Sequence, residues 1–197
     1  MTRTVVFDTE TTGIPTNKKY DALRASNNWP SIVSICWMVF EDKVYVRTEN
    51  HIIKPEGWTI PEVVVKIHGI TTEKAMAEGK PLREIMMLFK DDVAAADQIV
   101  AHNLHFDKNV VFNAYRWQLQ MDPMEFWKES AELCTMERAR AEMRIPSPYT
   151  WTKDFKPPKL DELYEDTFKV KAPADAHNAM RDVDVLQQIL WKRWSTF

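Results

Sequence analysis

The sequence has few cysteines, only short apolar runs and no excess of positive charge, and each of these absences excludes a class of protein. The two cysteines, Cys36 and Cys134, belong to no Cys-x-x-Cys or Cys/His pattern, which excludes a zinc knuckle and a disulfide scaffold. We expect both to be buried and reduced. Apolar runs such as Ile35–Phe40 are far shorter than the ~20 residues that cross a bilayer, so we expect no membrane span.

The charge balance is slightly acidic, with 26 Lys plus Arg against 29 Asp plus Glu and a formal net charge of −3. It excludes the basic field by which non-specific duplex-binding proteins neutralise many phosphates. At the N-terminus, Met1–Thr4 leads directly into a β-rich segment and leaves no room for a signal peptide. We therefore expect a cytoplasmic protein.

The length of 197 residues, 45% of them hydrophobic, is that of one ordinary domain with a substantial core. The sequence contains no internal repeat and no low-complexity tract. We expect a single domain over residues 1–197.

The order of the expected elements predicts an α/β domain with a mixed sheet. Three β-rich segments open the chain, and a turn at Glu41–Lys43 makes the last two an antiparallel hairpin. Helices are expected to begin near Pro61 and Pro81, and a proline-rich loop at 144–158 is of the long kind that is often functional. The remaining expected elements are strands at 98–101 and around Leu133 and helices at 106–119, 136–143 and 178–194.

Two carboxylates close the first apolar strand, in the segment Val5–Gly13. Asp8 and Glu10 are two residues apart, and strand alternation places such residues on the same face. Two adjacent carboxylates at the end of a buried strand repel each other unless one is protonated or a cation lies between them. The pair therefore indicates a site for a hard metal ion.

Two further carboxylates head apolar helix faces. Asp107 shares a helix face with three apolar residues, Val110, Val111 and Ala114. Asp182 lies at the start of a second apolar face, formed by Val185, Leu186, Ile189 and Leu190. An ionised carboxylate on an inward face needs an Arg, a Lys or a metal ion as partner. The alternative is that each aspartate merely stabilises a helix N-terminus.

His177 lies five residues before Asp182, about 140° away on a helix, so it must precede the helix, with Asn178 as the N-cap. An imidazole there can reach a water beside the acidic cluster.

His51 and His105 have no motif role and are expected to be structural. The other acidic residues are expected to be solvated, and these are Asp91, Asp92, Asp161, Glu162, Glu165, Asp166 and Asp184.

Taken together, these segments resemble the DnaQ-like 3′-5′ exonucleases with the DEDDh signature, whose fold is similar to that of ribonuclease H. The family's three motifs resemble Asp8–Gly13, Ala101–Asp107 and His177–Asp182, in the same order and complete. The tyrosine branch of the superfamily would need Tyr where Asn178 stands, so the histidine branch matches. Weaker matches, at 67–71, 134–136 and 158–164, extend the resemblance over nearly the whole chain.

The resemblance implies a mixed five-stranded sheet flanked by helices, and hydrolysis of phosphodiester bonds from a 3′ end to release 5′-mononucleotides. It further implies two divalent ions, Mg²⁺ or Mn²⁺, with Asp8 bridging both, Glu10 and Asp182 on one, and Asp107 near the other. His177 would be the general base. The positive charge of these ions would make a basic surface unnecessary.

The resemblance also implies contacts with the terminal nucleotides, made by Thr11, Thr12, Ile14, His68, His102, Asn103 and Phe106. Ile14 resembles an apolar wedge between the last bases and Phe106 a stacking surface, although both residue types also fit a core. In the proline-rich loop, Tyr149 and Trp151 are candidates for stacking on single-stranded bases.

The motifs leave the substrate open. We favour DNA, single-stranded or frayed, because the proline-rich loop and residues 158–164 resemble stand-alone relatives of the proofreading subunit more closely. The alternatives are an exoribonuclease that trims RNA ends or short oligoribonucleotides, and a catalytically silent, polymerase-associated binding domain, against which the intact signature argues. Only 15 residues follow Asp182, so we expect a free-standing enzyme without a dedicated polymerase-binding tail, although association with a polymerase stays possible.

Overall fold

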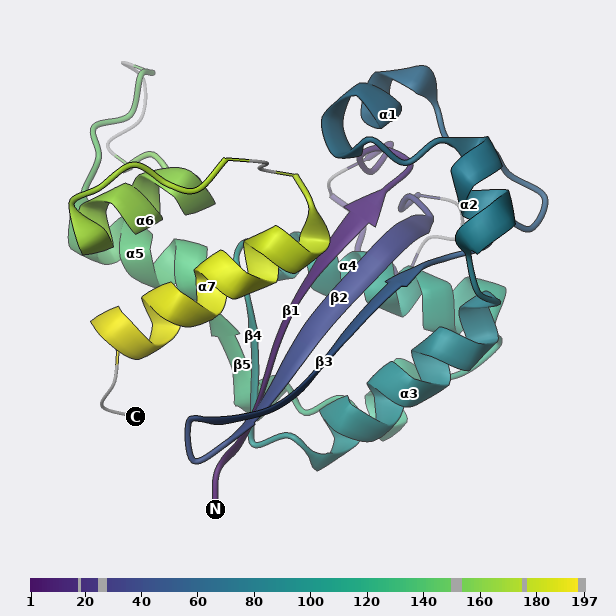
Figure 1. Ribbon diagram of the computed structural model, residues 1–197, viewed down its shortest axis with the longest axis horizontal. Coiled ribbons are helices and arrows are strands. Elements are labelled where there is room, and N and C mark those ends of the chain that lie inside the picture. The colour runs from purple at the N-terminus through teal and green to yellow at the C-terminus, as the bar shows by residue number, and fades with distance from the viewer. Residues whose placement is uncertain (18, 25–27, 150–153, 175–176, 195–197) are drawn as a thin grey trace.

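A five-stranded mixed sheet forms the centre of the computed structural model, which describes residues 1–17, 19–24, 28–149, 154–174 and 177–194 (Figure 1). In the strand order β3-β2-β1-β4-β5, the pairs β1–β2 and β2–β3 are antiparallel, whereas β1–β4 and β4–β5 are parallel. The predicted sheet is confirmed. Its strands are β1 (Arg3–Thr11), β2 (Ile32–Glu41), β3 (Val44–Ile52), β4 (Gln98–Ala101) and β5 (Glu132–Cys134).

Helices cover both faces of the sheet, with α3 and α4 on one side and α5, α6 and α7 on the other (Figure 1). Two short helices, α1 and α2, lie beyond the end of the sheet at which β1 terminates. The helices are α1 (Glu62–His68), α2 (Thr72–Glu78), α3 (Leu82–Ala95), α4 (Leu104–Asn113), α5 (Thr135–Met143), α6 (Leu160–Phe168) and α7 (Ala179–Arg193). In the described part of the chain, no helix is long and apolar enough to cross a membrane.

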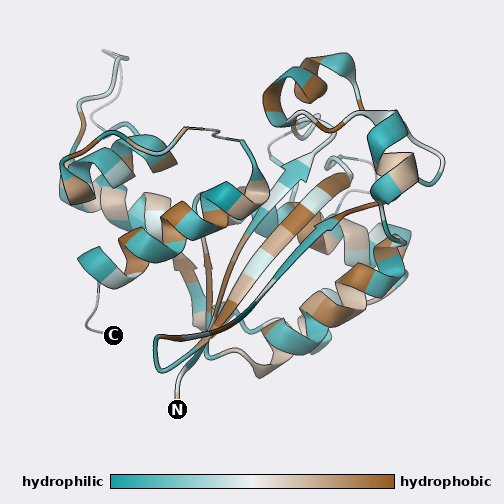
Figure 2. Cartoon of the chain, in the orientation of Figure 1, coloured by the Kyte–Doolittle hydropathy of each residue, from teal (hydrophilic) through white to brown (hydrophobic). Residues whose placement is uncertain are grey.

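Alternation along β1 divides its side chains between two cores. Val5 and Phe7 pack with residues of α3 and α4, and Val6 packs with residues of α7. Strand β2, apolar along most of its length, contributes to both cores (Figure 2). The same alternation, continued to the end of β1, turns Asp8 toward the α7 layer and Thr9 toward the α4 layer.

Three predicted helices keep their place but change their bounds. The helix expected at 106–119 begins at Leu104, and after Asn113 it continues as one π-helical turn, Ala114–Gln118, closed by the bond from the Leu119 N–H to the Ala114 carbonyl. Helices α5 and α7 end within one residue of the expected positions. Helices α2 and α6 were not predicted as elements.

The expected exposure of Asp92 is wrong. Its side chain is buried, where it accepts a hydrogen bond from Trp37 Nε1 at 2.8 Å and pairs with the guanidinium groups of Arg3 and Arg47. Two cations and an indole N–H compensate for the loss of water around this carboxylate. The contacts tie α3 to β1, β2 and β3.

Other expectations of exposure hold only in part. Asp161, Glu162 and Asp166 on α6 are half-buried and ion-paired, whereas Asp91, Glu165 and Asp184 are exposed as expected.

Both cysteines are free, but only Cys36 is buried, and Cys134 is half-buried. Cys36 stands opposite Asp8 in the β1–β2 register. Burial raises the pKa of this thiol to about 12, with a smaller contribution from the charge of Asp8. The thiol therefore stays protonated and unreactive.

Candidate active site

The predicted acidic motifs meet at a cavity of about 580 Å³ at the end of β1. Its walls come from β1, the segment that follows β1, the first turn of α4 and the starts of α6 and α7. The residues that line it are Asp8, Thr9, Ile14, Pro15, Trp29, His102, Asn103, His105, Phe106, Asp107, Leu160, His177 and Asp182.

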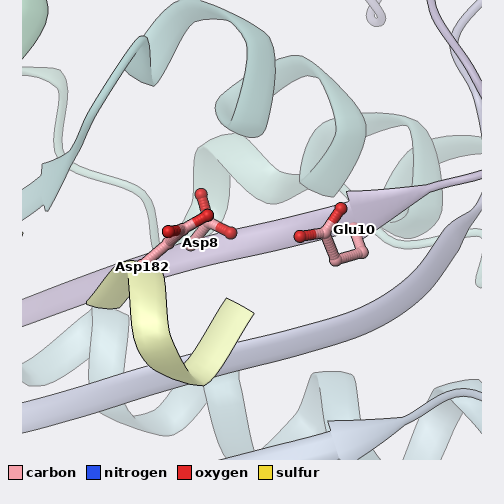
Figure 3. A group of neighbouring side chains, drawn as sticks. All are labelled: Asp8, Glu10 and Asp182. Atoms are coloured by element: carbon pink, nitrogen blue, oxygen red, sulfur yellow. The ribbon is translucent and has the colours of Figure 1, made fainter. Parts of the chain in front are cut away.

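Three carboxylates gather beside β1 (Figure 3). Asp8, Glu10 and Asp182 each offer an oxygen, and these oxygens lie within 4.8 Å of one another. Asp8 and Glu10 share the face of β1 that packs on α7, and Asp182 lies in the first turn of that helix. The cap of α7 fixes this position, because the Asn178 side chain accepts the backbone N–H of Met180 at 3.1 Å. The predicted N-cap and the buried stripe below Asp182 are confirmed.

Asp107 approaches the same end of β1 from the α4 layer. Its Oδ1 accepts two hydrogen bonds from Thr9, from the backbone N–H at 3.1 Å and from Oγ1 at 2.7 Å. The aspartate is buried, and the apolar face predicted below it is buried too. The structure thus unites Asp8, Glu10 and Asp182 in one group and holds Asp107 at the cavity through Thr9.

Crowding and burial disfavour ionisation of this group. Burial, together with the charges of Asp182 and Asp107, raises the pKa of Glu10 to about 8. Burial is also the main reason why the pKa of Asp107 rises to about 7, although its bonds from Thr9 oppose the shift. The pKa of Asp8 is raised well above its ordinary value by burial and by the charges of Asp107, Asp182 and Glu10.

A divalent cation would relieve this repulsion. The donors of the group are all carboxylate oxygens, the ligand type that Mg²⁺, Ca²⁺ and Mn²⁺ prefer. Asp8, Glu10 and Asp182 are therefore the residues that could hold a metal ion, with Asp107 beside them.

His177 lies where the sequence predicts it, just before α7 and outside the helix. Its backbone is left-handed, with φ 65°, and its N–H donates to Oδ2 of Asp182 at 3.3 Å. The residue is exposed and lines the cavity together with Asp8. An imidazole at this place can accept a proton from a water molecule at the carboxylates.

The two expected base contacts differ in exposure. Ile14 is 74% exposed and lines the cavity, so its alternative role as a core residue is wrong. Phe106 is half-buried, with one side toward the cavity and its ring 5.9 Å from that of Trp29. Thr11 is the last residue of β1, and its hydroxyl donates to the Gly13 carbonyl at 2.7 Å. Thr12 follows the strand, and its hydroxyl accepts the N–H of Ser31 at 3.1 Å.

The remaining expected substrate residues are divided between two cavities. His102 and Asn103 line the main cavity, but both ring nitrogens of His102 already have partners, Thr135 Oγ1 and the Pro158 carbonyl, each at 3.0 Å. Burial lowers the pKa of His102, although its bond to the Pro158 carbonyl opposes the shift. His68 lies instead in a smaller cavity of about 160 Å³, which Glu10 also lines.

Sequence reasoning missed three features of the site. Trp29 lines the cavity and contacts the rings of His105 and Phe106, each at 5.9 Å between centroids. His105 lines the cavity, although we expected a purely structural role. Thr9 holds Asp107; alternation along β1 was the available signal, because it turns Thr9 away from Asp8 and Glu10.

Of the two aromatic residues expected to contact bases from the proline-rich loop, the structure describes only Tyr149. Trp151 lies outside the described residues. Tyr149 is exposed, and it is not among the residues that line the main cavity.

Comparisons with known proteins identify the family. No curated protein sequence matched the chain. Solved structures with the same fold include zinc-bound E. coli exonuclease I with single-stranded DNA (TM-score 0.75, 19% identity, 99% of this chain and 42% of that one). A second is E. coli exonuclease I with a dT13 oligonucleotide (TM-score 0.74, 20% identity, 98% of this chain and 41% of that one). A third is exonuclease I from Methylocaldum szegediense (TM-score 0.73, 18% identity, 100% of this chain and 42% of that one).

The chain spans about two fifths of the length of these exonuclease I chains. At this level of identity they show the fold, which is the predicted ribonuclease H-like α/β architecture. The family model of the RNase T exonucleases matches residues 5–190. The chain therefore belongs to this exonuclease family, within the DnaQ-like 3′-5′ group that its motifs resemble.

Proposed function

We propose that the chain is a single exonuclease domain that removes 5′-mononucleotides from the 3′ ends of single-stranded or frayed DNA. The observation that carries the proposal is the group of three carboxylates with oxygens within 4.8 Å of one another, two of which, Asp8 and Asp182, line one cavity with the exposed Ile14. Support for a DNA substrate comes from the solved structures, in which exonuclease I binds single-stranded DNA and a dT13 oligonucleotide. RNA ends remain the second candidate substrate.

The donor set fits divalent ions, two in the proposed mechanism, held by Asp8, Glu10 and Asp182 with Asp107 beside them. Bound Mg²⁺ or Mn²⁺ supplies positive charge at the scissile phosphate and makes water more acidic. Such charge explains how a chain with a net charge of −3 attracts a polyanion. We also propose a cytoplasmic location for the enzyme.

The protein's own groups then have simple roles. His177 takes the proton of the attacking water, which displaces the 3′ oxygen from phosphorus. Ile14 and Phe106 contact the faces of the terminal bases, which carry no sequence information. Backbone groups after Glu10 contact the 3′ terminus. We therefore expect trimming that is independent of sequence.

The function is tested with 5′-labelled single-stranded DNA and RNA of matched sequence, in Mg²⁺ or Mn²⁺. We expect a ladder that shortens from the 3′ end of DNA, and its loss in Asp182→Asn. Asp184→Asn is the matched control, because Asp184 lies on the same helix but is exposed. A ladder on RNA alone would establish the exoribonuclease, and no metal-dependent product from either strand would favour the silent binding domain.

Replacing His177 should slow the chemical step without dismantling the site. We expect His177→Gly to reduce kcat by about 10²-fold, the ordinary contribution of a general base, and added imidazole to restore part of the rate, since this position is exposed. His51→Gln is the control, because His51 bonds to Glu49 within β3. A wild-type rate for His177→Gly would exclude the proposed base.

A further inference from the structure

Arg181, next to Asp182 in α7, connects the candidate site to α6. Its side chain is 12% exposed, and its Nη1 lies 2.7 Å from Oδ1 of Asp182. Its Nη2 lies 2.7 Å from Oδ1 of Asp161 on α6 and also donates to the Pro173 carbonyl. One guanidinium group therefore joins a carboxylate of the site to two other segments.

These contacts fix the orientation of the Asp182 carboxylate. Oδ1 is held by Arg181, and Oδ2 accepts the backbone N–H of His177 at 3.3 Å. Rotation about the last bond of an aspartate is otherwise soft, so an unpaired carboxylate would sample many orientations. A planar guanidinium held at both of its terminal nitrogens restricts that rotation better than a flexible ammonium could.

We propose that Arg181 is a positioning residue, which Asp161 holds in place and which orients the Asp182 carboxylate toward Asp8 and Glu10 for metal binding. The inference rests on the proposed metal-dependent function. Groups that hydrogen-bond to a metal ligand without contacting the metal themselves commonly contribute 10–100-fold to metal affinity. Arg181 is not one of the four acidic residues and the histidine that make up the signature of the family. Asp161 was expected to be solvated.

The competing explanation is that Arg181 only fastens α7 to α6. The same helix provides a matched control in Arg193, which is 19% exposed and makes the same kind of bridge. Arg193 pairs with Asp166 of α6 at 2.5 Å and with Glu142 of α5 at 2.9 Å. If the role of Arg181 is purely structural, substitutions at the two arginines will have equivalent effects.

The test is Mn²⁺ binding without nucleic acid, followed through the EPR signal of the free ion in titrations of the full chain. We expect Arg181→Gln and Asp161→Asn to weaken Mn²⁺ binding by about 10–100-fold. Arg193→Gln should leave the affinity unchanged while lowering the melting temperature. Arg181→Lys keeps the charge but lacks the two terminal nitrogens of the planar guanidinium. It should therefore recover only part of the Mn²⁺ affinity that Arg181→Gln loses.

Unchanged or tighter Mn²⁺ binding in both Arg181→Gln and Asp161→Asn would overturn the inference, and so would an equal loss in Arg193→Gln. Asp161→Asn changes a half-buried residue outside the cavity lining, which keeps the test valid if Arg181→Gln fails to fold. The two proposals fail separately. A wild-type protein that binds Mn²⁺ but degrades neither DNA nor RNA contradicts only the proposed function.

Discussion

Asp8→Asn is expected to reduce the rate of DNA hydrolysis by at least ~10³-fold, the equivalent of about 4 kcal/mol of lost charge stabilisation. The same change should raise the melting temperature of the metal-free protein at pH 8. Without a cation, the folded chain keeps Asp8 near Glu10 and Asp182, and burial and this repulsion raise its pKa well above the ordinary value. Asparagine keeps the shape of the side chain and removes that cost.

The opposite signs of the two effects make the experiment decisive. The melting temperature in EDTA should rise by about 2–4 °C for each kcal/mol of repulsion removed, and the gain should vanish below about pH 3, where Asp8 is protonated in both the folded and the unfolded chain. Asp184→Asn, an exposed change, should alter neither activity nor melting. A variant that is inactive and also melts lower in EDTA has lost its structure, and retained activity would exclude Asp8 from the site.

The candidate site could be predicted largely because its parts obey local periodicity. Alternation placed Asp8 and Glu10 on one face of β1, and that face proved to be the one covered by α7. The 3.6-residue period placed Asp182 above a buried stripe, and the N-cap preference of asparagine located the start of α7 at Asn178. Each of these inferences needed only a few neighbouring residues.

The features that were missed depend on partners far away in the chain. Asp92 is buried because Arg3, 89 residues earlier, and Arg47, 45 residues earlier, converge on it. Nothing near Asp92 in the sequence distinguishes it from its exposed neighbour Asp91. Trp29 likewise enters the site through its ring contacts with His105 and Phe106 of α4, which lie far from it in the sequence. Tertiary contacts of this kind override local preference and have no periodic signal.

The missed helices have a different cause. Helix α2 has seven residues and α6 has nine, and helices this short are only marginally stable without tertiary contacts. For α6, packing supplies the stability, since Leu163 is fully buried against the α7 layer. The π-helical turn after Asn113 also has no sequence signature that periodicity could detect.

The second large effect concerns pH. In EDTA, the melting temperature is expected to fall as the pH rises from about 5 to 8. Glu10, with a pKa of about 8, and Asp107, with a pKa of about 7, bind protons more tightly in the folded chain than in the unfolded one, where ordinary values near 4 apply. Their contribution to stability is complete below the unfolded values and is lost as the pH rises through the folded ones.

A divalent cation should remove this loss by replacing the missing protons. With Mg²⁺ or Mn²⁺ at 100 times its dissociation constant, the added stability is about 2.7 kcal/mol, or roughly 5–10 °C in melting temperature for a chain of this size. The gain should be larger at pH 8 than at pH 5, because protons compete for the same carboxylates at low pH. Scanning calorimetry at both pH values, with EDTA or metal, measures this gain. In EDTA, Glu10→Gln should reduce the fall in melting temperature between pH 5 and pH 8 without abolishing it, because Asp107 still titrates. Melting in EDTA that is flat or rises from pH 5 to pH 8 would show that these carboxylates are not crowded in the folded chain, and the case for a metal site at the end of β1 would fail with it.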